Sequence, residues 1–232
     1  MGILDNYNNL KEEIKKVAID VGRDPEEIEV VAISKTFPTK IVQEAIDAGI
    51  GLFGENKVQE AKGKIQELKG DFQFHMVGHL QSNKAKDAVS LFDLIHSIDK
   101  LNTALRIDKE AEKIGKKQKI LLQVNTSGED TKSGVQPGMV LDICNDITEL
   151  FNIQLCGLMT IGPMTRNNDM IRDSFRMLKQ LLNDVNESIG LNIDVLSMGM
   201  SSDYKIAIEE GSTMLRVGTA IFGERNRAGH HA

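Results

Sequence analysis

A lysine stands at the end of an apolar run near the start of the sequence. The segment VVAISKTFPTK is apolar up to Ile33, reaches Lys35, and is then interrupted by Pro38. Most lysines are solvated, so a charged boundary between a strand and a loop is the first explanation. The second is chemical, because a lysine with a lowered pKa at the rim of a packed site can form a Schiff base with a carbonyl compound.

Hydroxyl and glycine residues gather in two segments near the C-terminus. SMGMSSDYKIAI supplies Ser201 and Ser202 where a helix is predicted to begin, and RVGTAIFGER supplies Gly218 and Thr219 at the start of the next helix. One serine in such a place is usually a helix cap without a ligand. Two helix starts that converge instead predict a phosphate site, because their N–H groups face the anion.

Short apolar runs alternate with longer helical patterns along the chain. Helical spacing predicts an amphipathic lead-in helix that ends at Gly22. Candidate strands follow at residues 28–34, 50–54, 72–77, 94–98, 119–125, 153–159, 193–198 and 213–218. A stretch long enough for a helix separates each pair, and Gly49 and Gly190 are predicted helix caps.

This alternation of apolar strands and helices favours parallel pairing with both faces of the sheet covered. Eight such units in 232 residues predict a single (β/α)8 TIM barrel with an N-terminal lead-in helix, in one domain spanning residues 1–232. A doubly wound open sheet is the alternative, because strand number alone does not prove closure. In a barrel the site lies at the C-terminal ends of the strands. Those ends carry Lys35, Asn56, His79, Asn125, Met159, Thr160, the stretch from Ser197 to Ser202, Arg216, Gly218 and Thr219.

Arg216 is the hardest of these residues to explain as a surface group. On the last strand it shares a face with Met214, whereas Leu215 and Val217 take the other face and suit the helix layer. Arg216 is therefore predicted to point into the barrel mouth. A buried guanidinium needs an acceptor, which a ligand would provide. Together, an imine-forming lysine, a phosphate site and an arginine suit pyridoxal 5′-phosphate, with its ring nitrogen on Arg216.

Six segments, in order, carry a family resemblance. VVAISKTFPTK, LFGENKVQEA, HMVGHLQSNK, GLMTIGP, LSMGMSSD and GSTMLRVGTAIFGER resemble the signature segments of the YggS/PROSC family of pyridoxal phosphate homeostasis proteins. That family is similar to the barrel domain of alanine racemase. The resemblance implies a (β/α)8 barrel, pyridoxal 5′-phosphate bound covalently to Lys35, and cofactor contacts from Asn56, Ser201, Arg216, Gly218 and Thr219. His79 also matches a motif residue, where it either touches the cofactor or braces the loop.

The expected chemistry is binding without efficient turnover. An arginine facing the pyridine nitrogen disfavours its protonation and makes the ring a poorer electron sink. The alanine racemase type takes its second base, a tyrosine, from an additional β domain, whereas Tyr7 and Tyr204 are expected in the lead-in helix and near the phosphate. We expect a carrier that holds, buffers or delivers the cofactor, with apo pyridoxal phosphate enzymes as candidate recipients. A racemase or other pyridoxal phosphate enzyme, and a cofactor-independent Schiff-base aldolase, are the alternatives.

Composition and residue patterning argue against several other kinds of partner and site. A net charge of −6 gives no reason to expect nucleic acid or anionic membrane as a partner. Two cysteines without metal-ligand spacing favour the reducing cytoplasm, and no signal peptide or membrane-spanning stretch is expected. His75 and His79 are predicted on a strand and its following loop, so no metal site is expected there. The adjacent histidines of the tail AGHHA are interpreted as bystanders, and a monomer is expected.

The longest polar connection is NTSGEDTKSGVQPG, residues 125–138. Its glycines, Gly128, Gly134 and Gly138, have permissive backbones that would allow it to move over the barrel mouth. A lid and a solvated surface excursion are the two alternatives.

Overall fold

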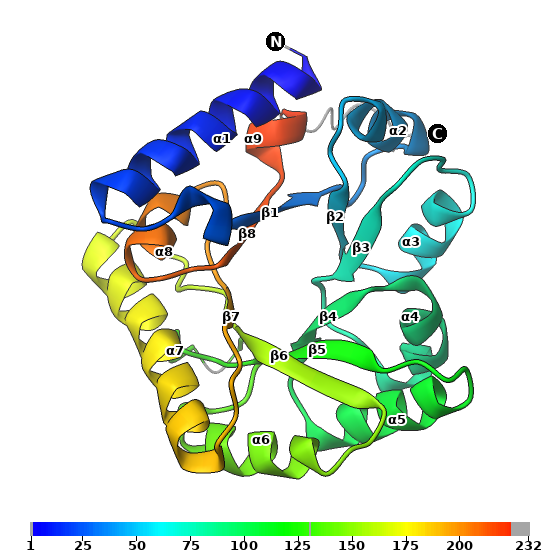
Figure 1. Cartoon of the computed structure of the whole chain (residues 1–232), viewed down its shortest axis with the longest axis vertical. Coiled ribbons are helices and arrows are strands. Elements are labelled where there is room, and N and C mark those ends of the chain that lie inside the picture. The colour runs from blue at the N-terminus through cyan, green and yellow to red at the C-terminus, as the bar shows by residue number, and fades with distance from the viewer. Residues whose placement is uncertain (1, 130, 224–232) are drawn as a thin grey trace.

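Parallel strands form a closed barrel in the computed structural model, which describes residues 2–129 and 131–223. Consecutive strands are neighbours, and β8 pairs with β1 to complete the ring (Figure 1). The strands are β1 (Glu29–Ile33), β2 (Leu52–Glu55), β3 (Gln73–Met76), β4 (Leu94–Ile98), β5 (Gln118–Gln123), β6 (Ile153–Met159), β7 (Val195–Ser197) and β8 (Met214–Val217). The predicted (β/α)8 barrel is confirmed, and the open-sheet alternative is wrong.

Helices cover the outside of the barrel (Figure 1). They are α1 (Ile3–Asp20), α2 (Thr39–Asp47), α3 (Val58–Ile65), α4 (Ala85–Leu91), α5 (Leu101–Glu112), α6 (Val140–Thr148), α7 (Asn168–Ile189), α8 (Tyr204–Glu209) and α9 (Thr219–Phe222). α1 is the predicted lead-in helix, and α7 ends at Gly190, whose left-handed backbone makes it the predicted cap. The tail AGHHA and the last two residues of RVGTAIFGER lie outside the described residues.

Strand side chains alternate between two apolar layers. On β8, Leu215 and Val217 pack between the strands and the helices, whereas Met214 packs inside the barrel. The interior layer consists of Val31, Ile33, Val77, Leu94, Leu121, Met159 and Met214. Arg216 therefore shares the inward face with Met214, as its spacing predicts.

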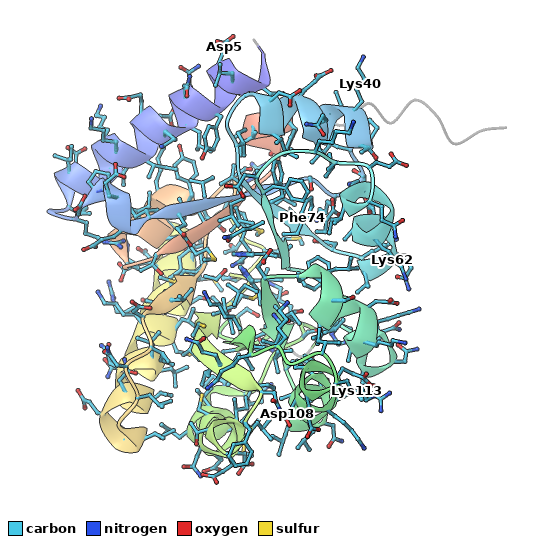
Figure 2. The ribbon with its side chains drawn as sticks, turned by 45° about the vertical axis from the view of Figure 1, so that its right-hand side comes forward. Asp5, Lys40, Lys62, Phe74, Asp108 and Lys113 are labelled. Carbon is cyan, nitrogen blue, oxygen red and sulfur yellow. The ribbon has the colours of Figure 1, made fainter. Side chains whose placement is uncertain are left out.

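Several charged side chains of the helices, among them Lys40, Lys62 and Lys113, lie on the outer surface. Figure 2 shows Lys40, Lys62 and Lys113 projecting away from the barrel, whereas Phe74 of β3 is buried in the layer between the strands and the helices. Phe74 stacks on Phe53 of β2 with 5.5 Å between the ring centroids, and both rings are buried. Removal of this apolar area from water stabilises the layer that holds the strand ends in place.

The lead-in helix α1 lies beside α8 and α9 (Figure 1). The Asn6 side chain donates to the Ile221 carbonyl of α9 over 3.0 Å, and the Tyr204 hydroxyl of α8 donates to the Glu13 carboxylate. Arg23, just beyond α1, donates to the carbonyls of Ile208 and Ser212. These contacts fix α8 and α9, the last two helices at the barrel mouth, to the start of the chain.

A chain of hydrogen bonds crosses the barrel interior. His96 Nε2 lies 3.1 Å from His75 Nδ1, and His96 Nδ1 lies 2.9 Å from Ser197 Oγ. Ser197 Oγ also accepts from the guanidinium of Arg216 over 2.6 Å. Burial lowers the pKa of His75 to about 3, and burial together with His75 and Arg216 lowers the pKa of His96 well below its usual value. Both imidazoles are therefore neutral at pH 7.

These buried histidines predict that the fold loses stability in mild acid. In the unfolded chain His75 takes up a proton below about pH 6.5, whereas in the folded chain it does so only near a pKa of about 3. The free energy of unfolding therefore falls as the pH falls through this window, by about 2 kcal/mol per histidine between pH 7 and pH 5. Urea unfolding at both pH values should show that His75→Gln removes the share of one histidine, about 2 kcal/mol, from this loss, and an unchanged loss in the variant would contradict the prediction.

Candidate functional site

A cavity of about 600 Å³ opens at the C-terminal ends of the strands. Its lining includes all seven residues that sequence reasoning assigns to the site: Lys35, Asn56, His79, Ser201, Arg216, Gly218 and Thr219. The lining also contains apolar side chains, among them Ile33, Val77 and Ile161. Asn125, Met159 and Thr160 are buried at strand ends and are not among the lining residues. The barrel thus brings the seven predicted residues together from the ends of β1, β2, β3, β7 and β8.

Lys35 lies in a tight turn just after β1 and is half-buried. The next residue, Thr36, has a φ of 69°, which is unusual for a β-branched residue, and its N–H donates to the Glu60 carboxylate. Phe37 then packs on Phe222 of α9, with 4.9 Å between the ring centroids. The turn that carries Lys35 is therefore packed against the helix that begins at Thr219.

The phosphate end of the site differs in part from the prediction. α9 begins at Thr219 with Gly218 at its N-cap position, as predicted. α8 begins only at Tyr204, so the expectation that a helix starts at Ser201 and Ser202 is wrong. The reason is local, because Asp203 occupies the N-cap position and its carboxylate accepts from Met200 N over 2.6 Å, closing a turn. Both serines still line the cavity from that turn.

Arg216 points into the mouth, as predicted, but its acceptors are different. Its two terminal nitrogens donate to Ser197 Oγ over 2.6 Å and to the Thr160 carbonyl over 2.7 Å. The protein itself therefore supplies two acceptors, and contact between Arg216 and a ligand stays a prediction. Burial lowers the pKa of Arg216 to about 10, so the guanidinium remains charged at pH 7. The cavity thus has a fixed positive charge on its floor.

Asn56 and His79 line the cavity from the loops after β2 and β3. His79 Nδ1 lies 3.5 Å from the Asp99 carboxylate, and the histidine side chain is 51% exposed whereas that of Asp99 is 6% exposed. His79 therefore both lines the cavity and contacts the loop after β4. Gly78 lets the ends of β2 and β3 meet, because a Cβ there would lie 2.3 Å from the Asn56 carbonyl oxygen. Sequence reasoning missed Gly78, although its place beside His79 was a signal.

The connection over residues 125–138 is part of the cavity wall, apart from residue 130, which is not described. Val124 bridges to Val135, and the Gln123 side chain donates to the Ser133 carbonyl over 2.9 Å. A Cβ on Gly134 would lie 2.5 Å from Asn125 N, so this glycine serves close packing. Part of the connection is exposed, so the surface-excursion alternative stays open. Movement as a lid stays a prediction.

Sequence reasoning also missed two residues of this connection that line the cavity, Lys132 and Ser133. Lys132 Nζ donates to the Gly162 carbonyl over 2.7 Å and pairs with Glu129 at 2.8 Å. The signal for them was the length and polarity of the connection, which pointed to the segment but not to these side chains.

The described parts of the chain contain no cluster of side chains that could bind a metal ion. His75 faces His96 in the interior, whereas His79 faces Asp99 at the mouth. Over residues 2–129 and 131–223, no group of three or more His, Cys, Asp or Glu residues could hold a metal ion. Across those same residues, no helix combines the length and apolar character needed to cross a membrane.

The donor set around the cavity suits a small molecule that has both a carbonyl and an anionic group. Lys35 offers an amine, Ser201 and Thr219 offer hydroxyl donors, and Arg216 offers a positive charge. The first turn of α9 adds backbone N–H groups beside Gly218. Pyridoxal 5′-phosphate, which carries an aldehyde and a phosphate, fits this set of donors.

Comparisons with known proteins identify the family. The family model described as the alanine racemase N-terminal domain matches residues 6–226. The pyridoxal phosphate homeostasis protein of Aquifex aeolicus is 38% identical over 226 residues, which cover 97% of this chain and 99% of the relative. This chain belongs to the pyridoxal phosphate homeostasis protein family. Its relative of the same name from Escherichia coli K12 is 38% identical over 97% of each chain.

Solved structures agree with this membership of the pyridoxal phosphate homeostasis protein family. PipY of Synechococcus elongatus, in a structure with pyridoxal phosphate bound, is 34% identical with a TM-score of 0.85, over 95% of this chain and 100% of that chain. A protein of unknown function from Bifidobacterium adolescentis is also 34% identical, with a TM-score of 0.89 over 94% of each chain. An alanine racemase of Clostridium difficile shares the fold, with 16% identity and a TM-score of 0.78, over 98% of this chain and 58% of that chain.

Proposed function

We propose that this protein binds pyridoxal 5′-phosphate in the cavity as a Schiff base on Lys35. The observation that carries the proposal is the meeting of Lys35, Arg216 and the Gly218–Thr219 helix start in one cavity. The neutral Lys35 amine adds to the aldehyde carbon, a C=N bond forms, and the aldehyde oxygen leaves as water. The bound cofactor in the PipY structure supports the proposal.

Each of the other site residues has a role that follows from its place. Ser201, Gly218 and Thr219 bind the phosphate, because hydroxyl and N–H donors suit a dianion. Arg216 faces the ring nitrogen from the floor. Asn56 and His79 contact the cofactor from the loops after β2 and β3, and His79 is oriented by Asp99.

The same arrangement favours holding and delivering the cofactor over turnover. The charged Arg216 guanidinium disfavours a proton on the ring nitrogen, which weakens the ring as an electron sink. Tyr204 donates to Glu13 on α1 and Tyr7 packs in the outer core, and neither is among the residues that line the cavity in the described part of the chain. A second base opposite Lys35 is therefore not provided by tyrosine. Apo pyridoxal phosphate enzymes are the proposed recipients.

The cellular setting of the proposal is the cytoplasm, with the protein acting as a monomer of one domain over residues 1–232. Both cysteines are free thiols, and Cys144 is buried, which raises its pKa to about 12. An unreactive buried thiol and a half-buried one suit a reducing compartment.

Spectroscopy and peptide mapping test the proposal. Purified protein mixed with pyridoxal 5′-phosphate should develop a visible absorption band, which borohydride removes by reducing the C=N bond. The pyridoxyl mass should then be found on Lys35, and finding it on Lys57, Lys84 or Lys205 instead would overturn the assignment. Rapid loss of optical activity from an added L-amino acid would favour the racemase alternative, and a protein that stays colourless would favour the aldolase alternative.

A further inference from the structure

The residues on both sides of Lys35 are held by one buried side-chain network. Lys64 of α3 is 7% exposed at its side chain, and its Nζ donates to the Ser34 carbonyl over 2.8 Å. The same Nζ donates to Glu55 Oε1 over 2.6 Å and to Glu60 Oε1 over 2.8 Å. Three acceptors satisfy the three hydrogens of the ammonium group. Lys64 is thus fully engaged beneath the turn.

The two carboxylates connect this lysine to the turn itself. Glu55 Oε1 also accepts from Ser34 Oγ over 2.7 Å, and Glu60 Oε1 also accepts from the N–H of Thr36. The network therefore forms hydrogen bonds with the carbonyl and hydroxyl of Ser34, the residue before Lys35, and with the amide of Thr36, the residue after it. Lys35 is the one residue between these two attachment points.

The backbone conformation of Thr36 shows why these hydrogen bonds matter. Its φ of 69° lies in the left-handed region, which a β-branched residue adopts only when its surroundings impose it. The hydrogen bond from its N–H to the Glu60 carboxylate helps to hold its backbone there. The Phe37 N–H also donates to the Ser34 carbonyl over 3.1 Å, so loss of Glu60 would loosen the turn at Thr36 and with it the direction of Lys35.

The network of Lys64, Glu55 and Glu60 is better suited to fixing the geometry of the turn than to stabilising the fold. A buried ion cluster is a weak source of stability, because desolvation of the charges offsets much of their attraction. Glu55 illustrates this cost, since burial raises its pKa and its Oε2 has no hydrogen-bond partner. What the cluster provides that apolar side chains cannot is a set of directed hydrogen bonds to the backbone on both sides of Lys35.

We propose that Lys64, Glu55 and Glu60 are positioning residues that hold the turn after β1 and so aim the Lys35 amine into the cavity. The inference rests on the proposed function, because Lys35 must be the lysine that bonds to the cofactor. The network also keeps the ammonium of Lys64 away from that bond, because all three of its hydrogens are already committed.

Glu60→Ala is the variant that tests the inference, with Glu60→Gln as its rescue. Glu60 is partly exposed, so its truncation spares the fold, and the glutamine oxygen can still accept from Thr36 N–H. Glu110→Ala is the matched control, because Glu110 on α5 pairs with Lys113 and Arg106 and does not line the cavity.

Two ligands distinguish an effect on the position of Lys35 from an effect on ligand binding in the cavity. The rate at which the visible band forms at saturating pyridoxal 5′-phosphate reports the reaction of Lys35. The affinity for pyridoxine 5′-phosphate, which has no aldehyde, reports the cavity alone. Glu60→Ala should slow band formation on the order of tenfold or more and leave the pyridoxine 5′-phosphate affinity within about twofold. Glu60→Gln should recover most of the rate, and Glu110→Ala should leave it unchanged even if it lowers the melting temperature equally.

Three results would overturn the inference. They are an unchanged rate in Glu60→Ala, equal slowing in Glu110→Ala, and a loss of pyridoxine 5′-phosphate affinity that matches the loss of rate. A wild-type protein that forms no band would overturn the proposed function and this inference together. A normal wild type with an unaffected Glu60→Ala would overturn the inference alone.

Discussion

Replacement of Lys35 by alanine is expected to abolish the visible band formed with pyridoxal 5′-phosphate while leaving the protein folded. Lys35 is half-buried at the rim of the cavity, so truncation of its side chain removes little core contact. The amine that forms the C=N bond is lost entirely, and a weakened noncovalent complex is all that remains. Absorbance titration measures the first effect, and thermal melting followed by circular dichroism measures the second.

Lys132→Ala is the control for this prediction, because Lys132 is another lysine on the cavity wall. Its ammonium is engaged by Glu129 and by the Gly162 carbonyl, so we expect the band to persist without it. The assignment fails if Lys35→Ala retains a full borohydride-fixed label on Lys132, or if Lys132→Ala loses the band and Lys35→Ala keeps it.

The barrel could be predicted from the sequence because its signals are local. Each apolar run ends where a polar or glycine residue begins, and each of the predicted strands overlaps the observed one. The place of Lys35, Asn56 and His79 at one mouth then follows from the topology, since parallel strands bring their C-terminal ends together. Arg216 could be assigned to the inward face from strand alternation alone.

What could not be predicted depends on contacts between distant parts of the chain. The acceptors of Arg216 come from β7 and from the loop after β6, and nothing near residue 216 in the sequence identifies them. Lys64 reads as one more polar residue of a helix until the fold places Ser34 and Glu55 around it. The start of α8 was predicted two or three residues too early, because either serine is as good a cap by type as Asp203.

Loss of the hydroxyl groups at the phosphate end of the site is expected to cause a second large effect, a weaker affinity for pyridoxal 5′-phosphate. Ser201→Ala combined with Thr219→Val should weaken the binding of pyridoxal 5′-phosphate by about a hundredfold or more, because each lost hydrogen bond to a charged group costs about 1.5–3 kcal/mol. Unphosphorylated pyridoxal should bind nearly as before, since it makes no contact with these hydroxyls. Titration of both ligands against the wild type and the double variant measures the difference.

A matched double variant removes two hydroxyls of the same types away from the cavity. Ser90 on α4 and Thr148 on α6 donate to carbonyls of their own helices, so Ser90→Ala with Thr148→Val should leave both affinities unchanged. The prediction distinguishes an anion site from a general loss of shape, because distortion of the mouth would weaken pyridoxal as well. Equal loss of both ligands in the Ser201 and Thr219 double variant would place the phosphate elsewhere. Selective loss of the phosphorylated ligand instead means that the turn before α8 and the start of α9 meet on one anion, as their places around the cavity imply.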